Sequence, residues 1–109
     1  MPADERSQAW PEPVGDRVVF ENESIRVWRL SVQPGGVKPM HHHGLPYLIV
    51  PLSGGRGEIT SVDGTVRTHE DRPGVVIWRE AGETHRFRNL GSTPYENVLV
   101  ELKRHGTAP

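Results

Sequence analysis

The sequence predicts an all-β domain, because three features of its composition and patterning favour strands over helices. Val occurs 13 times among the 109 residues and Ala only four times, and β-branched side chains pack well on a pleated sheet but crowd a helix. Twelve Gly and ten Pro interrupt the chain so often that a helix bundle is excluded. Short strand-forming runs also recur at intervals of about eight to twelve residues, which is typical of β-sandwiches and small barrels.

Eight strand-like runs follow one another along the chain, and turn residues separate them. The runs are residues 17–21, 24–33, 47–52, 57–62, 65–70, 75–78, 84–89 and 95–103. The breaks between them carry Gly35-Gly36, Gly54-Gly55, Asp63-Gly64, Arg72-Pro73-Gly74 and Gly91-Ser92. Asp63-Gly64 lies between two alternating runs and predicts a hairpin with a two-residue type I′ turn, in which both central residues have positive φ.

The length of the chain is that of one domain. We assign residues 1–15 to a flexible N-terminal arm, residues 16–104 to a single β-barrel domain and residues 105–109 to a C-terminal tail. Trp10 lies within the arm, where it is either an incidental aromatic residue or an anchor that docks on the barrel or on a partner.

The charge pattern excludes two classes of partner. The 13 basic and 14 acidic residues are scattered without blocks and give a net charge of −1, so we expect no nucleic-acid partner and no membrane surface. No apolar run approaches the roughly 20 residues of a membrane span, and from the polar residues 1–13 we expect no secretory signal. The sequence contains no Cys, which excludes disulfides and thiol nucleophiles. We therefore expect a cytoplasmic protein.

Three consecutive histidines stand in the middle of the chain. On a strand, residues i and i+2 face the same side, so His41 and His43 can point to one centre while His42 points away. Neutral imidazole is a common metal ligand, and His85 at the start of a later run can supply a third one. His69 and His105 have no such partners, and we expect them on the solvated surface.

The spacing around these histidines is specific. Five residues separate Gly35 from His41, three separate His43 from Tyr47, and six more lead to Gly54. A second segment has the same kind of regular spacing, at Gly74, Glu80, Gly82, His85 and Asn89. The two segments closely resemble the paired motifs of the cupin family: Gly, five residues, His-x-His, three or four residues, Glu, six residues, Gly; then Gly, five residues, Pro-x-Gly, two residues, His, three residues, Asn.

The resemblance covers roughly residues 25–103 and has structural and functional implications. It implies a cupin-type double-stranded β-helix, or jelly-roll barrel, of six to eight antiparallel strands, with His41, His43 and His85 inside one mouth. It also implies a homodimer and a small-molecule ligand within the barrel. Phe87 and Asn89 alternate with His85 and are expected inside, Phe87 in the core and Asn89 as a tie for a loop.

Two positions depart from the family pattern. Glu80 replaces the family Pro and is either a substitute carboxylate ligand or a solvated turn residue. Tyr47 replaces the Glu that is usually the fourth metal ligand. Its phenol can act as a catalytic hydrogen-bond donor, as a phenolate ligand, or as a spacer that leaves the site degenerate. Without the carboxylate, three neutral imidazoles suit Fe, Ni, Zn or Cu as a divalent transition ion.

Several functions remain open from the sequence. Three protein ligands leave coordination positions free, as in catalytic metal sites, and some cupin dioxygenases for thiols or diketones use three histidines in this way. We therefore favour a metal-dependent enzyme on a small molecule, by dioxygenase-like chemistry or metal-assisted hydrolysis. The alternatives are a non-catalytic small-molecule binding or sensor protein and a sugar isomerase or epimerase.

Overall fold

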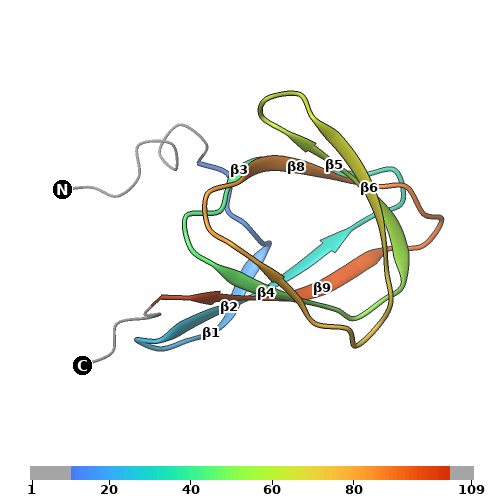
Figure 1. Ribbon diagram of the computed structural model, residues 1–109. Coiled ribbons are helices and arrows are strands. Elements are labelled where there is room, and N and C mark those ends of the chain that lie inside the picture. Colours follow the sequence, from blue (N-terminus) through green and yellow to red (C-terminus); the bar gives the residue numbers. More distant parts are fainter. Residues whose placement is uncertain (1–10, 104–109) are drawn as a thin grey trace.

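The computed structural model describes residues 11–103, and these form an all-β barrel without helices (Figure 1). The nine strands in this range are β1 (Arg17–Glu21), β2 (Ile25–Val32), β3 (Val37–His42), β4 (Tyr47–Pro51), β5 (Gly55–Ser61), β6 (Val66–Asp71), β7 (Ile77–Arg79), β8 (Thr84–Asn89) and β9 (Tyr95–Leu102). Within the described part of the chain, no helix is long and apolar enough to cross a membrane. Trp10 and His105 lie outside the described residues, and the domain boundaries and the homodimer stay predictions.

Two antiparallel sheets face each other and enclose the core (Figure 1). One sheet has the order β1-β2-β9-β4-β7 and the other the order β3-β8-β5-β6. The chain passes repeatedly from one sheet to the other, so strands that are neighbours in sequence mostly lie in opposite sheets. This arrangement confirms the predicted jelly-roll class and brings distant segments together around one interior.

The eight predicted runs omitted β3, which carries the first two histidines. Pro39 lies within this strand, and a proline normally argues against a strand because it donates no hydrogen bond to a ladder. β3 tolerates it as the edge strand of its sheet, where the register with β8 shifts between Lys38 and His41. The predicted run 75–78 was also displaced, because the strand there is Ile77–Arg79.

The β5–β6 hairpin is confirmed, but its predicted type I′ turn is wrong. Gly64 has a φ of 93°, whereas none of the other described residues except glycines has positive φ. The amide of Gly64 donates to the carbonyl of Ser61 at 2.8 Å, and the amide of Thr65 donates to Asp63 Oδ1 at 2.9 Å. The connection is therefore a turn with Val62 and Asp63 at its centre followed by a left-handed glycine, a common three-residue hairpin loop.

Alternating side chains of the strands build the interior. On β9, Tyr95, Asn97, Leu99 and Glu101 are buried while the intervening residues are only partly covered, as expected for period-two alternation. One apolar cluster consists of Leu30, Val32, Ile59, Phe87 and Tyr95, and a second of Val14, Tyr47 and Leu99. Val14 and Gly15 belong to the segment assigned to the arm, and both are buried. Phe87 is thus confirmed as a core residue.

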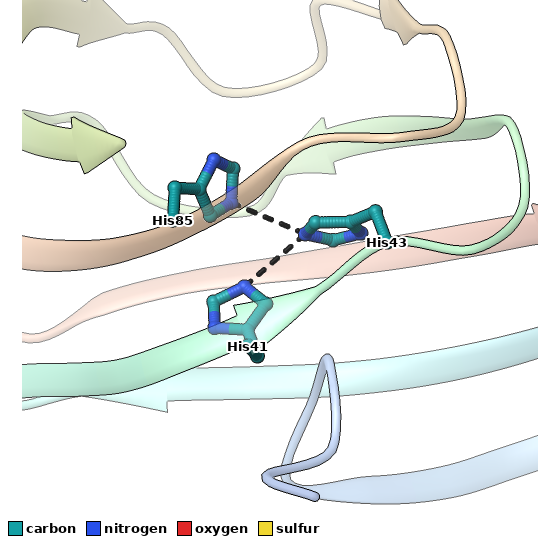
Figure 2. A group of neighbouring side chains, drawn as sticks. All are labelled: His41, His43 and His85. Atoms are coloured by element: carbon teal, nitrogen blue, oxygen red, sulfur yellow. Dashed lines mark hydrogen bonds between the residues drawn. The ribbon is translucent and has the colours of Figure 1, made fainter. Parts of the chain in front are cut away.

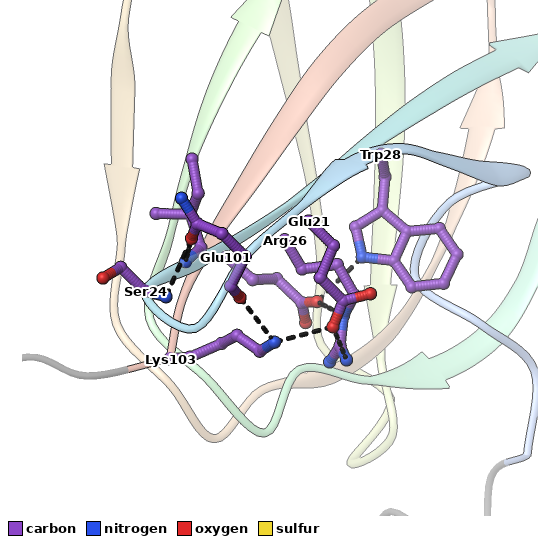
Figure 3. Close-up of polar contacts among 8 residues, drawn as sticks. Glu21, Ser24, Arg26, Trp28, Glu101 and Lys103 are labelled. Carbon is purple, nitrogen blue, oxygen red and sulfur yellow. Dashed lines mark hydrogen bonds and ion pairs between the residues drawn. The ribbon is translucent and has the colours of Figure 1, made fainter.

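Two polar arrangements hold the barrel around this interior. Asn89 ties a loop as predicted: its Nδ2 donates to the carbonyls of Val32 and Thr93, at 2.9 and 2.8 Å. At the end of the five-stranded sheet, Arg26 Nε and Trp28 Nε1 both donate to Glu101 Oε1, at 2.8 and 2.7 Å (Figure 3). Glu101 is only 4% exposed and lies opposite Tyr47, the first residue of β4, so these bonds tie β2 to β9 at the position that neighbours Tyr47.

Candidate metal centre

Three imidazole rings converge inside the barrel. His43 Nε2 lies 3.1 Å from His41 Nε2 and 3.2 Å from His85 Nε2 (Figure 2). The ring centroids are 4.9 Å apart in each pair, and the rings meet edge to face at 70°, 81° and 71°. All three side chains are buried. The structure therefore brings together the three residues that the sequence predicts as metal ligands.

Strand register produces this convergence. His41 of β3 pairs directly with His85 of β8, so their side chains rise from the same face of the sheet. His43 follows the end of β3, where its amide donates to the carbonyl of Glu83 at 2.9 Å and its carbonyl accepts from Gly82 at 2.7 Å. Gly82 has a φ of 117°, a conformation that L side chains rarely adopt. The two backbone hydrogen bonds of His43 thus bring its ring to those of His41 and His85.

The outer nitrogens of two rings are held by acceptors. His41 Nδ1 lies 2.7 Å from the carbonyl oxygen of Pro39, and His85 Nδ1 lies 3.0 Å from Glu83 Oε1. The Pro39 carbonyl only accepts, so it fixes the proton of the neutral His41 ring on Nδ1 and leaves the Nε2 lone pair for the centre. Glu83 contacts His85 Nδ1 at ion-pair distance, and its negative charge favours a proton on that nitrogen. Such outer contacts orient metal-bound histidines in proteins and raise their basicity.

Glu83 is itself held in place. Arg67 contacts both carboxylate oxygens, at 2.8 and 3.0 Å, and Ser61 Oγ donates at 3.0 Å. The contact with His85 and the hydrogen bonds from Arg67 keep the pKa of the Glu83 carboxyl well below its usual value despite its partial burial. A charged, anchored carboxylate therefore supports the His85 ring. Glu83 was not among the residues predicted for the site, although it precedes His85 by the two positions that place residues on one face of a strand.

The donor set fits a divalent transition ion. Metal–nitrogen bonds of about 2.0–2.1 Å at angles between 90° and 109° place the nitrogens about 2.8–3.4 Å apart, a range that includes the separations of 3.1 and 3.2 Å. Two of the three central nitrogens present lone pairs, and such lone pairs repel unless a proton or a cation lies between them. Among the described residues, His43 Nδ1 is buried without a hydrogen-bond partner. No contact therefore holds the proton of the neutral His43 ring on Nδ1.

Burial keeps the rings of His41 and His43 neutral. It lowers the pKa of His41 to about 4, although the contact with the Pro39 carbonyl opposes the shift. Burial, together with the neighbouring rings of His41 and His85, lowers the pKa of His43 to about 2. Deprotonated imidazole is the form that binds metal, so these two ligands are ready for an ion well below neutral pH.

Tyr47 lies against this centre. Its ring stacks on His43 with the centroids 4.0 Å apart and the planes 14° apart, and it is 1% exposed. Stacking restrains the plane of the imidazole and so the direction of its in-plane lone pair. Burial and the charge of Glu83 raise the pKa of the Tyr47 phenol well above its ordinary value. The protonated phenol is therefore a hydrogen-bond donor at neutral pH.

The remaining candidates divide into two groups. His42 points to another partner, since its Nδ1 lies 2.7 Å from Thr84 Oγ1, and exposed Glu80 accepts a hydrogen bond from Trp78 Nε1 at 2.6 Å. Neither residue belongs to the histidine group. The expectation that His69 lies on the solvated surface is wrong: its side chain is 26% exposed, contacts Asp71 and lines the interior. Only barrel closure, which the sequence pattern does not specify, brings it there.

A cavity of about 60 Å³ extends from the three histidines into the barrel. Apolar side chains form most of its wall, among them Leu30, Ile49, Ile59, Phe87 and Leu99. Its polar lining includes Tyr47 as well as the histidines. The cavity therefore adjoins the candidate metal site, and an apolar wall with few placed polar groups is typical of small-molecule sites.

Comparisons with known proteins agree with this geometry. The sequence model of the cupin domain matches residues 28–101. A crystal structure of a cupin domain from Bordetella pertussis is similar to this chain with a TM-score of 0.76 and 28% identity, covering 81% of this chain and 91% of that one. A search among curated proteins finds no match.

Two solved enzymes are similar over part of their length. The polyketide cyclase RemF from Streptomyces resistomycificus has a TM-score of 0.60 and 26% identity, over 76% of this chain and 57% of that one. The DMSP lyase DddQ from Ruegeria pomeroyi has a TM-score of 0.58 and 20% identity, over 80% and 42%. This chain therefore spans well under two thirds of both enzymes, and the second likeness concerns the fold alone.

Replacing Glu83 by Gln tests the support of His85. The amide retains the size of the side chain but loses the charge that holds the imidazole proton on Nδ1, so we expect Zn(II) affinity to fall about tenfold to a hundredfold. Isothermal titration with a competing chelator measures the change. Glu80→Gln is the matched control, an exposed glutamate in the adjoining turn, and should bind Zn(II) like the unchanged protein. Equal affinities for the two variants would contradict this role of Glu83.

The metal-free protein should lose stability as the pH falls from about 6.5 toward 4. The unfolded chain takes up protons on His41 and His43 near pH 6.5, whereas the folded chain resists protonation until the pH approaches the lowered pKa values. Protonation therefore favours the unfolded state across this window, by roughly 1–2 kcal/mol for each imidazole between pH 6.5 and 5.

Urea unfolding in the presence of EDTA, followed by circular dichroism, measures this loss. His41→Asn removes one of the two groups and should flatten the dependence above pH 5, where most carboxylates remain ionised. A free energy of unfolding that stays constant from pH 7 to 5 would contradict the buried, neutral state of these rings.

Proposed function

Because this chain belongs to the cupin family, we propose that it is a metal-dependent enzyme that acts on a small molecule held inside the barrel. The preferred chemistry is oxidation by dioxygen, and metal-assisted hydrolysis is the alternative. One observation carries the proposal: three buried imidazole Nε2 atoms converge on the wall of a cavity that can admit a ligand. A purely structural metal site would be closed by a fourth protein ligand.

The donor set favours catalysis over storage of an ion. A divalent transition ion held there would supply Lewis acidity toward an oxygen donor of the ligand and, as Fe(II), electrons for dioxygen. Three neutral imidazoles leave the positive charge of such an ion uncompensated, because Tyr47 stands where the family has a carboxylate. The charge is therefore available to a bound ligand, because none of the three direct ligands is an anion.

The chain's own residues complete the proposed site. The apolar wall of the cavity excludes water and strengthens polar interactions within it. The protonated phenol of Tyr47 lines the same space and can donate a hydrogen bond to an oxygen of the ligand. Glu83 and the carbonyl of Pro39 hold two of the rings, so the site is organised before a ligand arrives. The likeness to a polyketide cyclase at 26% identity supports an enzymatic role.

Oxygen uptake by metal-loaded protein tests this function. We expect the Fe(II) form to consume oxygen with a small 1,3-diketone such as pentane-2,4-dione or with a small thiol. Tyr47→Phe should lower kcat about tenfold to a hundredfold, the effect of losing one hydrogen bond to a charged or developing group. Its affinity for Fe(II) and Zn(II) should stay unchanged, because the phenol is a donor and not a ligand.

Two further variants make the result specific. Trp78→Phe removes an N–H donor from an exposed residue, 44% accessible, and should leave turnover unchanged. Tyr47→Glu restores a carboxylate beside the three imidazoles and should tighten metal binding. A large loss of metal affinity in Tyr47→Phe would mean that the phenolate is a ligand. If no metal-loaded form consumes oxygen or hydrolyses small esters, the chain is a binding protein and the enzymatic proposal is wrong.

A further inference from the structure

A second polar group lines the cavity apart from the three histidines. It consists of His69, Asp71, Tyr95 and Asn97, all of which border the same space. Tyr95 Oη donates to Asp71 Oδ2 at 2.7 Å, Asn97 Nδ2 donates to Tyr95 Oη at 3.1 Å, and His69 Nε2 lies 3.3 Å from Asp71 Oδ2. Asp71, Tyr95 and Asn97 are 6%, 3% and 4% exposed. Such a buried polar chain costs free energy unless its members are hydrogen-bonded.

The direction of these hydrogen bonds is fixed by Asp71. Its carboxylate only accepts, so the single phenolic proton of Tyr95 points to it. The Tyr95 oxygen must then accept from Asn97, and this requirement orients the Asn97 amide with Nδ2 toward Tyr95. Asn97 Oδ1 is left as a buried acceptor with no hydrogen-bond partner among residues 11–103.

The same carboxylate orients His69. In the neutral imidazole, donation from Nε2 to Asp71 leaves Nδ1 with a lone pair. His69 Nδ1 is also buried without a partner in the described part of the chain. The two ends of the chain of hydrogen bonds therefore present two unused acceptors, and most buried polar atoms in proteins are paired.

We propose that His69 and Asn97 form a subsite that binds hydrogen-bond donors, such as the hydroxyl or N–H groups of a small polyol-like molecule. Two acceptors next to a carboxylate match a group that donates, whereas a carbonyl or carboxylate of the ligand would meet lone pairs. The proposal rests on the proposed function for the ligand's other end, which would face the metal centre. The subsite itself requires no metal.

The prediction can be tested with three probes that share the O–CH2–CH2–O unit and have a decreasing number of hydroxyl donors. Ethane-1,2-diol has two hydroxyl donors, 2-methoxyethanol has one and 1,2-dimethoxyethane has none, while all three keep two oxygens. Titrations of EDTA-treated protein, followed by two-dimensional ¹⁵N NMR, should give affinities that fall about fivefold with each donor removed. The side-chain amide signal of Asn97 should move with the diol.

Variants assign the effect to this wall of the cavity. Asn97→Leu removes the acceptor and should reduce the preference for the diol over 2-methoxyethanol to less than twofold. Val98→Ala, a change on the opposite face of the same strand, should preserve the preference. A ¹⁵N spectrum of the unchanged protein should show that Nδ1 of His69 is unprotonated. This measurement does not depend on the folding of any variant.

Equal affinities for the three probes, or a preference that persists in Asn97→Leu, would overturn the subsite. A protonated Nδ1 of His69 would overturn its part in it. These outcomes are independent of the metal, because the probes are measured in EDTA. If donor selectivity appears while no metal-loaded form has activity, the subsite stands and the enzymatic proposal fails; the converse result would reject the subsite alone.

Discussion

The pairing of His41 with His85 across β3 and β8 is the constraint on which the site depends. Two imidazoles on directly opposed positions of one sheet point into the barrel together, and the backbone bonds of His43 to the next loop bring the third ring to them. The close approach of three nitrogens is therefore built by backbone register and not by flexible side chains. A shift of one residue in this register would turn His41 to the outside of the sheet.

This arrangement places an unusual amount of polarity inside a small barrel. The three histidines, Tyr47 and the Asp71 group all border one cavity, where apolar side chains would pack more favourably. The cost is partly offset where the polar groups have partners, as Glu83 does with Arg67 and Asp71 with Tyr95. Two of the atoms left without partners, His69 Nδ1 and Asn97 Oδ1, belong to residues that border the cavity, and they carry the proposed subsite.

The sequence predicted the ligands better than their surroundings. His41, His43 and His85 could be identified because strand alternation and the spacing of the glycines are local properties of the chain. Arg67 supports His85 only through Glu83. This support depends on a contact between β6 and the loop before β8, which no local sequence pattern predicts. The prediction that His69 lies on the surface was wrong for the same reason. His69 lines the cavity only because the second sheet packs against its own.

Differences in the fold have equally specific causes. β3 escaped prediction because Pro39 lies within it, and an edge strand with a shifted register can accommodate a proline. The hairpin at Asp63 was predicted correctly, but the turn type was not. The loop has three residues, Val62 to Gly64, and only Gly64 among them has positive φ. The presence of the hairpin therefore follows from local sequence, whereas its turn type and the existence of β3 depend on hydrogen bonds with the neighbouring strands.

The central claim is that three imidazoles together hold one divalent transition ion. X-ray absorption spectroscopy of protein loaded with one equivalent of Zn(II) tests it directly, because the fine structure beyond the edge reports both the first-shell distances and the number of imidazole rings. We expect nitrogen scatterers at about 2.0–2.1 Å, with outer-shell scattering from three rings and the remaining positions taken by light oxygen donors. A spectrum with one imidazole or none would contradict the account.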